Sequence, residues 1–349
     1  MTVLEGCNPS RILIRAVNWI GDAVMTTPAI GMIRSRFPRA EITILANPLV
    51  SELFSPHPYI DRVVTFDRAG RHRGVRGRLR LAAEIRRMNF DLAIILPNSF
   101  DSALVPWLAR VPVRIGKQSD GRGFMLTSRY SPVELPPLPH EIEYYCNLVR
   151  HFGISGENSG LVLQTTSEED RAAADLLAMH GIGHDDFILG LNPGATFGAA
   201  KRWYPERFAG AAQQLADMWN ARPVIFGSPA ERPLADAIAT HLGGRGLNLA
   251  GTTTVRHLMA LIRRCNFLIT NDSGPMHIAA AFGVPLVAVF GPTDHATTSP
   301  RSNTAVIVRK QTECAPCKLR ECPTDHRCMT AVTADEVVAA AKQIAATCQ

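Results

Sequence analysis

Short apolar runs alternate with longer segments of mixed polarity along the first third of the chain. The runs are RILIRAV, EITILA, RVVTF and DLAIILP, all within residues 11–97. Continuous apolar strands of this kind suit a parallel sheet that is covered on both faces. The segments between them, at 22–37, about 48–55 and about 75–89, predict helices. This βαβα alternation, which extends to about Gly116, predicts a doubly wound α/β domain.

The alternation restarts after an interruption. GISGENSG at 153–160 and TTSEEDR at 165–171 contain few large apolar residues and predict an interdomain connection. Beyond it, the apolar runs FILGLNPG, PVIFGSP, LNLAG, FLITNDSG and PLVAVFGP alternate with predicted helices at about 205–219, 230–242, 254–264 and 274–282. We therefore expect two doubly wound domains, 1–165 and 166–349, with a ligand cleft between the carboxyl ends of their strands.

Composition agrees with two domains, because 349 residues exceed the usual size of a single core and the hydrophobic content of 46% is ordinary for a soluble chain. The net charge of +6 favours acidic partners, which include phosphates, nucleic acid and an anionic membrane surface. The longest apolar stretch, Ile278 to Phe290, is shorter than the roughly 20 residues of a membrane span. MTVLEGCNPSR at the N-terminus lacks the apolar core of a secretory signal. We expect a cytoplasmic protein.

The motif TNDSGPMH, at 270–277, follows a predicted strand of the second domain. Ser273 can cap the next helix and Pro275 suits its first turn. The unsatisfied N–H groups at such a helix start favour a bound anion, and His277 would add a donor. The alternative is that Asp272 and Ser273 only cap the helix.

Two further strand ends of the second domain carry small and polar residues. NPGATFGAAKRW, at 192–203, places Gly194, Thr196 and Lys201 in one loop, whose hydroxyl, amides and ammonium suit a diphosphate leaving group. The alternative is a solvated basic loop. FGSPAER, at 226–232, puts Glu231 in the first turn of a helix. There it either accepts hydrogen bonds from ribose hydroxyls or only complements the helix dipole.

The stretch NWIGDAVMTTPAI, at 18–30, joins the first strand to a helix. Gly21 permits a tight turn and a close approach by a ligand. Asp22 either caps the helix or takes a proton from a hydroxyl nucleophile as a general base.

An arginine-rich stretch at 66–87 contains Arg68, Arg71, Arg73, Arg76, Arg78, Arg80, Arg86 and Arg87. Such a run forms a solvated surface, or it binds a phosphate-rich acceptor or anionic lipid. Nucleic acid is disfavoured, because the stretch has no interleaved aromatic residues and the chain has no recognisable helix-turn-helix, RNA-binding or zinc-finger spacing.

Four of the eight cysteines lie close together in the sequence, with the spacing C-x2-C-x4-C-x5-C and His326 nearby: Cys314, Cys317, Cys322 and Cys328. They could bind zinc or an iron–sulfur cluster in a structural role, form disulfides, or stay reduced. We do not expect a catalytic role.

Taken in order, these motifs resemble glycosyltransferase family 9, the bacterial heptosyltransferases of the lipopolysaccharide inner core. The resemblance extends over nearly the whole chain and also includes LPNSFDSALVPWLARVPVRIG, LAGTTT and AAAFGVPLVAVFGPT. PNSF and FGAAKRW look like the members that add the second heptose. The resemblance implies a GT-B fold, in which two Rossmann-like domains face a central cleft. The acceptor would bind to 1–165 and the nucleotide sugar to 166–349, with the C-terminal helix able to pack back on the N-terminal domain.

The resemblance also implies roles for single residues. Asp22 becomes the catalytic base, and Lys201 with Thr196 contacts the donor diphosphate. Further donor contacts would be Gly194, Glu231, Asp272, Ser273, Gly274 and His277, and acceptor contacts would be Gly21, Asn98, Ser99, Arg71 and Arg73. The implied reaction is an inverting displacement that moves heptose from ADP-heptose to a heptose of a lipid-linked core acceptor, without a cofactor or a catalytic metal.

A lipid-linked acceptor implies peripheral contact with the cytoplasmic face of the inner membrane. Three alternatives from other classes stay open: transfer of a different nucleotide sugar, a GT-B-type epimerase, and a non-catalytic nucleotide-binding protein. An epimerase would turn over the donor without any acceptor, and a binding protein would gain no activity from Asp22.

Overall fold

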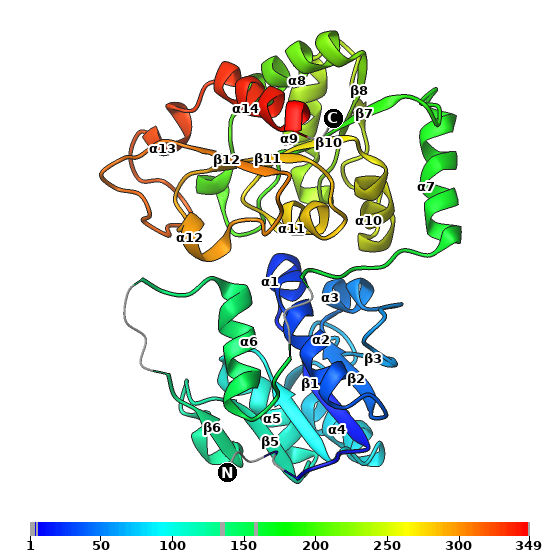
Figure 1. The fold of residues 1–349 in the computed structure, drawn as a ribbon, viewed down its shortest axis with the longest axis vertical. Helices are drawn as coiled ribbons and strands as arrows, with labels where there is room; N and C mark the ends of the chain where they lie inside the picture. The colour runs from blue at the N-terminus through cyan, green and yellow to red at the C-terminus, as the bar shows by residue number, and fades with distance from the viewer. Residues whose placement is uncertain (1–3, 5, 133–136, 157–159, 348–349) are drawn as a thin grey trace. The chain divides into compact units, whose positions relative to one another are not determined.

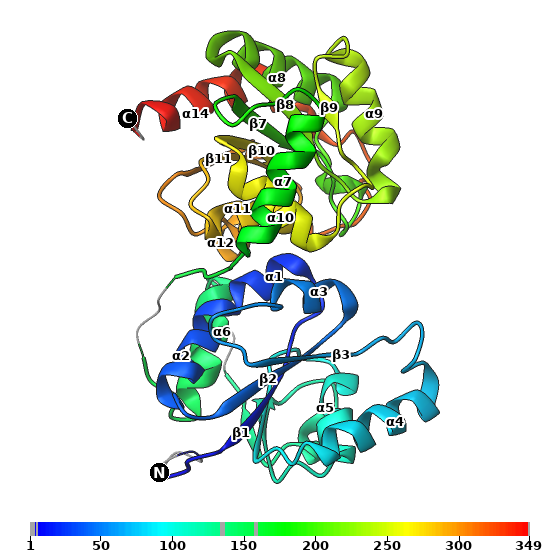
Figure 2. The ribbon, with the colours of Figure 1, turned by 90° about the vertical axis from the view of Figure 1, so that its right-hand side faces the viewer.

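The computed structural model describes residues 4, 6–132, 137–156 and 160–347 (Figure 1). The chain divides into two compact units, 1–164 and 165–349, one residue from the expected boundary. Each unit is a parallel sheet with helices on both faces (Figures 1 and 2). The two doubly wound units expected from the apolar runs are therefore present.

Within the described residues, the first unit contains the strands β1 (Arg11–Arg15), β2 (Glu41–Ala46), β3 (Arg62–Thr65), β4 (Leu92–Ile95), β5 (Val113–Lys117) and β6 (Ser128–Tyr130). Its helices are α1 (Ile20–Met25), α2 (Thr27–Arg36), α3 (Pro48–Leu53), α4 (Gly74–Arg87), α5 (Phe100–Leu108), the 3-10 helix η1 (Arg122–Met125) and α6 (Glu141–His151). The strand order is β3-β2-β1-β4-β5-β6.

The described part of the second unit contains the strands β7 (Phe187–Asn192), β8 (Ala221–Ile225), β9 (Leu247–Asn248), β10 (Phe267–Asn271), β11 (Leu286–Phe290) and β12 (Ala305–Arg309). Its helices are α7 (Ser167–Met179), η2 (Ala199–Lys201), α8 (Pro205–Trp219), η3 (Pro229–Glu231), α9 (Arg232–His241), α10 (Val255–Arg264), α11 (Gly274–Ala281), α12 (His295–Thr298), α13 (Arg327–Thr330) and α14 (Ala334–Thr347). The strand order, β12-β11-β10-β7-β8-β9, repeats that of the first unit.

This strand order creates one special position in each sheet. The chain builds outward from β1 to β3 and then crosses back to β4, and it does the same from β7 to β9 and back to β10. The carboxyl ends of the two central strands therefore diverge into connections on opposite faces, and ligands of open α/β sheets bind in the crevice that this leaves. The β1/β4 and β7/β10 ends are the places to look for sites.

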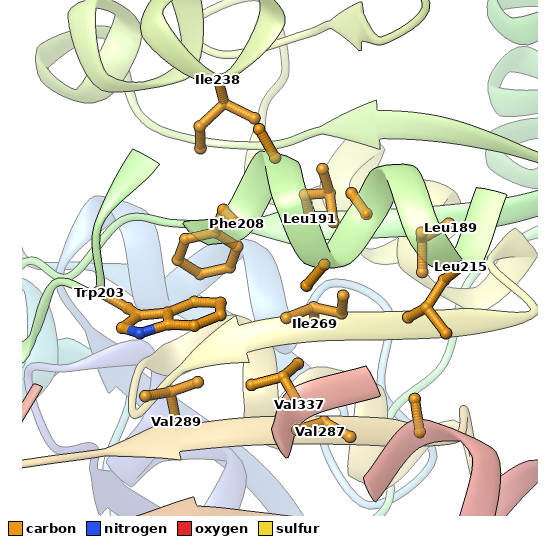
Figure 3. Packing of buried hydrophobic residues seen from close by; sticks show 14 of the residues in the cluster. Leu189, Leu191, Trp203, Phe208, Leu215, Ile238, Ile269, Val287, Val289 and Val337 are labelled. Atoms are coloured by element: carbon orange, nitrogen blue, oxygen red, sulfur yellow. The ribbon is translucent and has the colours of Figure 1, made fainter. Parts of the chain in front are cut away.

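The core of the second unit includes the C-terminal helix. Val337 and Ile344 of α14 are buried in one cluster with Leu215, Val287 and Trp203 (Figure 3). Helix α14 packs against α8, β11 and β12 of its own unit. That it also packs back on the N-terminal domain stays a prediction.

Two helix boundaries differ from those the sequence predicted. The segment 22–37 forms two helices, because Pro28 in the first turn of α2 has no N–H to continue the ladder of α1. The stretch at 165–171 is largely the start of α7 and not a connection. Thr166 and Glu169 form a reciprocal capping box there, a sequence signal that the expected connection overlooked. None of the described helices is long and apolar enough to span a membrane.

Glu169 also ties α7 to α10. Arg256 donates from Nε to Oε1 of Glu169 (2.7 Å) and from Nη2 to Oε2 (2.5 Å). The side-chain hydrogen bonds from Arg256 hold the pKa of Glu169 below its usual value. A carboxyl whose folded-state pKa is depressed stabilises the fold above its unfolded pKa, and that stabilisation is lost as the pH falls through the folded pKa.

We expect Glu169→Gln to lower the free energy of unfolding by about 2 kcal/mol at neutral pH, because Arg256 loses its bidentate partner in a partly buried site. The difference between variant and wild type should shrink as the pH falls below about 4. Urea unfolding followed by circular dichroism at several pH values measures this. Asp217→Asn, which breaks an exposed pair with Arg245, is the control and should cost about 0.5 kcal/mol. A pH-independent difference for Glu169→Gln would contradict the assignment.

Candidate active site

Amide side chains tie together the carboxyl ends of β7 and β10. Asn192 donates from Nδ2 to the hydroxyls of Thr270 (3.2 Å) and Ser273 (2.9 Å). Asn271, which is fully buried, donates from Nδ2 to the carbonyl of Pro193 (2.6 Å). These bonds fix the two strand ends relative to each other at the switch point of the sheet.

Lys201 and Asp272 form an ion pair at this edge. The distance from Nζ to Oδ2 is 2.7 Å, and the side chains are 13% and 5% exposed. Thr293, after β11, donates its hydroxyl to the same carboxylate oxygen (2.5 Å). The ammonium also lies over the ring of Phe197, 5.0 Å from its centroid. This arrangement holds the Lys201 ammonium, paired with the Asp272 carboxylate, at the switch point of the sheet.

Trp203 anchors the loop that carries Lys201. Its backbone N–H donates to Oδ1 of Asn271 (3.1 Å), and its indole N–H donates to the carbonyl of Val332 (3.1 Å). The ring packs edge-on against Phe208 in the hydrophobic core (Figure 3). A large buried side chain two residues after Lys201 therefore fixes that end of a loop composed mainly of small residues.

The first turn of α11 is open. Ser273 occupies the N-cap position, but its side chain makes no capping hydrogen bond and instead interacts with Asn192. The Met276 N–H is bonded to the Ser273 carbonyl (3.1 Å) and Pro275 has no N–H, which leaves the Gly274 N–H at the helix start. His277 is buried in the same turn. The prediction that Ser273 caps the helix is wrong, and the positive end of the dipole is left for an anion.

Glu231 is buried against Gly194. Its Oε2 accepts from the backbone N–H and the hydroxyl of Ser228, both at 2.8 Å, which completes a capping box. A Cβ at Gly194 would overlap the Glu231 carboxylate. Within the described residues Oε1 makes no hydrogen bond, so one oxygen performs the structural role and the other is left for a ligand. Thr196 lies exposed in the same loop as Gly194.

The segment between β12 and α14 holds the Lys201 loop from the other side. Ala200 donates its N–H to the carbonyl of Arg320 (3.0 Å), and His326 donates from Nε2 to the carbonyl of Ala200 (2.7 Å). The other ring nitrogen of His326 accepts from the hydroxyl of Tyr204 (3.1 Å). A Cβ at Gly198 would overlap the Arg320 carbonyl. In the sequence His326 stands out only as a neighbour of cysteines, so this contact was missed.

The clustered cysteines lie in this same segment and are free thiols. Burial, followed by the proximity of Cys314, Cys317 and Cys322, raises the pKa of the Cys328 thiol to about 11. Hydrogen bonds from Thr324 lower the pKa of Cys322. Among the residues that the structure describes, no group of three or more His, Cys, Asp or Glu side chains is arranged to hold a metal ion. A structural metal cluster at these cysteines stays a hypothesis.

In the first unit, Asp22 lies in the first turn of α1, after β1 at the switch point. Burial and then the carboxylates of Asp22 and Glu141 raise the pKa of Tyr145 well above 10, so its hydroxyl stays protonated beside Asp22. Tyr145 was missed because its position on α6 becomes adjacent only in the fold. Gly21 is not in a tight turn, because α1 begins at Ile20 and Gly21 has helical backbone.

Arg15, at the end of β1, fixes the backbone that leads from this strand to Asp22. Its guanidinium is buried and donates to the carbonyls of Ala16 (2.5 Å) and Leu45 (3.1 Å) and to the side chain of Asn18 (3.3 Å). Burial lowers the pKa of Arg15 to about 10. In the sequence, Arg15 only interrupts an apolar run, so its contacts could not be predicted.

Asn98 and Ser99 follow β4 and are exposed. Asn98 accepts from the hydroxyl of Tyr144 (2.9 Å), so the consecutive tyrosines of α6 face both strand ends of the switch point. The fully buried Arg122 donates to the carbonyl of Ser99 (3.1 Å) and fixes this loop. These two predicted acceptor residues therefore share one edge of the sheet with Asp22.

Arg71 and Arg73 lie farther away, after the edge strand β3. Arg71 pairs with Glu84 of α4 (2.6 Å). The side chain of Arg73 is exposed and, within the described residues, makes no hydrogen bond or ion pair. Their assignment as acceptor contacts stays a prediction.

Two Rossmann-like units, each with polar side chains at its switch point, are the architecture of GT-B glycosyltransferases. The model of glycosyltransferase family 9 (heptosyltransferase) matches residues 78–327. The chain therefore belongs to glycosyltransferase family 9 and is an enzyme of the glycosyltransferase class.

Relatives and solved structures agree. The chain is 32% identical over 311 residues to lipopolysaccharide heptosyltransferase 2 of Escherichia coli K12, covering 86% of this chain and 88% of the relative. It resembles the structure of E. coli ADP-heptose lps heptosyltransferase II with a TM-score of 0.81 and 28% identity, over 96% of this chain and 98% of that one. A glycosyl transferase family 9 structure from Veillonella parvula gives a TM-score of 0.88 and 25% identity, over 96% and 97%.

We expect His326→Asn to loosen the Lys201 loop, because asparagine tolerates the left-handed backbone of residue 326 but is too short to reach the Ala200 carbonyl. Hydrogen–deuterium exchange of the amides at 197–203 should become about tenfold faster, as expected for the loss of one well-formed hydrogen bond. Tyr204→Phe, which keeps the His326 bond to Ala200, is the matched control. Unchanged exchange in His326→Asn would show that the contact does not hold the loop.

Proposed function

We propose that this enzyme transfers heptose from ADP-heptose to a heptose of a lipopolysaccharide inner-core acceptor, with inversion at the anomeric carbon. The names of its relatives support heptose as the sugar. The observation that carries the proposal is the Lys201–Asp272 pair beside the uncapped start of α11. A cation and an open helix start at a switch point suit a nucleotide diphosphate.

We assign the donor diphosphate to Lys201, Thr196 and the Gly274 N–H. Lys201 can exchange part of its interaction with Asp272 for the phosphate oxygens, and the pair keeps the ammonium in place before the donor arrives. Gly194, which has no side chain, leaves room for the Glu231 carboxylate, and Oε1 of Glu231 accepts from a ribose hydroxyl. Fixed donors of this kind stabilise the charge that develops on the departing ADP.

The acceptor would bind to the first unit, with Asp22 as the general base. Asn98, Ser99 and Gly21 share the strand edge of Asp22, and Arg71 and Arg73 are assigned to acceptor phosphates. The neutral hydroxyl of Tyr145 lies within electrostatic range of this base, because burial and then the charge of Asp22 raise the tyrosine pKa.

The reaction is a single displacement. The acceptor hydroxyl oxygen forms a bond to the anomeric carbon as the bond from that carbon to the ADP oxygen breaks. The hydroxyl proton passes to Asp22, and the bonding electrons leave with ADP. Attack from the face opposite ADP inverts the anomeric centre. We assign no step to a metal ion or a cofactor.

We further propose that the enzyme works at the cytoplasmic face of the inner membrane, where a lipid-linked acceptor would be anchored. Membership of family 9 favours transfer over epimerisation or passive nucleotide binding. Donor turnover that needs no acceptor would instead favour an epimerase.

Asp22→Asn should lower the rate of heptose transfer by about 10²–10⁴-fold, the usual contribution of a general base, while ADP binding stays unchanged. Product formation from ADP-heptose and an acceptor with one heptose, followed by mass spectrometry, gives the rate. Calorimetry gives ADP affinity, and NMR of the product gives the anomeric configuration. Asp185→Asn, a fully exposed carboxylate, is the matched control. Full activity of Asp22→Asn would remove Asp22 from the mechanism.

Lys201→Met should weaken ADP binding and lower kcat/KM by about 10²-fold, because the leaving diphosphate loses its cation. The variant also leaves Asp272 without its ion-pair partner, so its melting temperature must be compared with that of Lys201→Met/Asp272→Asn. Recovery of stability without recovery of kcat/KM in the double variant would separate the catalytic from the structural effect. Wild-type kcat/KM in either variant would argue against the donor site.

A further inference from the structure

Exposed apolar side chains gather on one face of the first unit. Of the eleven large hydrophobic side chains that are exposed in the described residues, five lie on α4, α5 and η1: Val75, Leu79, Phe100, Trp107 and Phe124, with exposures from 40% to 75%. We call these five the apolar face. Scattered exposed hydrophobic residues need no explanation, but a cluster of this kind marks an interaction surface.

Three of the five are aromatic and touch one another. Phe100 and Trp107 lie seven residues apart on α5, on the same side of the helix. The ring of Phe124, from η1, lies between them, 6.2 Å from the Phe100 centroid and 5.9 Å from that of Trp107. Three exposed rings in contact form a compact apolar surface on the outside of the unit.

Unpaired arginines flank the apolar face. On α4, Arg76 and Arg80 follow Val75 and Leu79 with the same spacing of four residues, so a basic row runs beside the apolar one. The side chain of Arg76 is exposed and makes no hydrogen bond or ion pair with any described residue, as is also true of the Arg73 side chain before the helix.

Helices α4 and α5 present this face together. Arg78 of α4 donates from Nε to Oδ1 of Asp101 on α5 (2.5 Å), and Arg68 pairs with the other oxygen of Asp101 (3.5 Å). The two helices pack side by side (Figure 2). The acidic group between the helices is therefore already neutralised, and the surface has an excess of positive charge.

We propose that the apolar face and its arginines dock this enzyme on a bilayer that contains anionic phospholipid. Aromatic rings favour the level of the lipid headgroups, arginines attract anionic headgroups, and their long side chains reach the phosphates while their stems cover apolar surface. A second copy of the chain fits less well, because a symmetric contact would bring the same arginines together.

The location of the face gives the docking a purpose, which rests on the proposed function. Helix α5 begins directly after Asn98 and Ser99, and both α4 and α5 start at the carboxyl edge of the sheet that carries Asp22. A lipid-linked acceptor could therefore keep its anchor in the bilayer while its sugars reach the predicted acceptor residues.

Sedimentation with vesicles tests whether the arginines contribute to membrane binding. Wild-type protein should bind vesicles of phosphatidylglycerol and phosphatidylcholine more strongly than pure phosphatidylcholine, and less strongly at high salt. Arg76→Gln/Arg80→Gln should weaken binding about tenfold or more. Arg222→Gln/Arg309→Gln removes two exposed arginines from the second unit and is the matched control. Equal losses in the two double variants would overturn the proposal.

Trp107 fluorescence tests the apolar contact. In a Trp19→Phe background, anionic vesicles should shift the emission to shorter wavelength, and brominated lipids should quench it. Replacement of Trp107 by Phe in the same background should abolish both changes. Phe124→Gln should weaken vesicle binding, and Met179→Gln, which replaces a still more exposed apolar side chain in the second unit, should not. An unquenched Trp107 would overturn the proposal.

The outcomes also separate this proposal from the proposed function. The Arg76/Arg80 variant should keep wild-type transfer to an acceptor stripped of its acyl chains. Loss of that transfer would assign these arginines to the acceptor and overturn the docking role. Vesicle binding without any transfer would leave docking intact and refute the reaction. Concentration-dependent dimerisation that Phe124→Gln abolishes, without vesicle binding, would assign the face to a second copy.

Discussion

The donor side of this enzyme depends on one ion pair, in which Lys201 lies against the nearly buried Asp272. A charge removed from water is costly unless it is paired and hydrogen-bonded. Asp272 meets that condition twice, through Lys201 and the hydroxyl of Thr293. The ion pair therefore keeps the Lys201 ammonium at the switch point before any ligand binds. An incoming diphosphate then meets a positioned charge and does not have to order a flexible lysine.

The loop before Lys201 cannot hold this position by itself, because GATFGAA offers few side chains for packing. Three other parts of the unit fix it. Trp203 is buried in the core, Asn271 of β10 accepts from the Trp203 backbone, and His326 with the Arg320 carbonyl binds Ala200. The C-terminal segment thus supports the proposed donor site although it carries none of the predicted donor contacts. Small residues at Gly194 and Gly198 are required because neighbouring groups fill the space of a Cβ.

The sequence predicted the parts of this arrangement that depend on local patterns. Buried central strands such as β1 and β10 are continuous apolar runs, and parallel strands end at one edge, which is enough to assign Lys201, Glu231 and Asp272 to one site. The edge strand β12 is only half-buried and was missed. The contact of His326 with Ala200 joins residues 126 positions apart and leaves no local pattern. Pro28 marks the break between α1 and α2 in the sequence. A proline is also tolerated in the first turn of a single helix, so it did not decide between one helix and two.

The two units share one strand order but differ in the chemistry of their switch points. In the first unit Asp22 lies within the first turn of α1, so a carboxylate already complements the positive end of that helix. A phosphate there would meet a like charge. In the second unit the Ser273 side chain does not cap α11, and the Lys201 ammonium lies beside the start of that helix. One fold thereby favours an anion at α11 and disfavours it at α1. The same difference agrees with the proposed role of Asp22 as a general base, because a phosphate is disfavoured at its end of the helix.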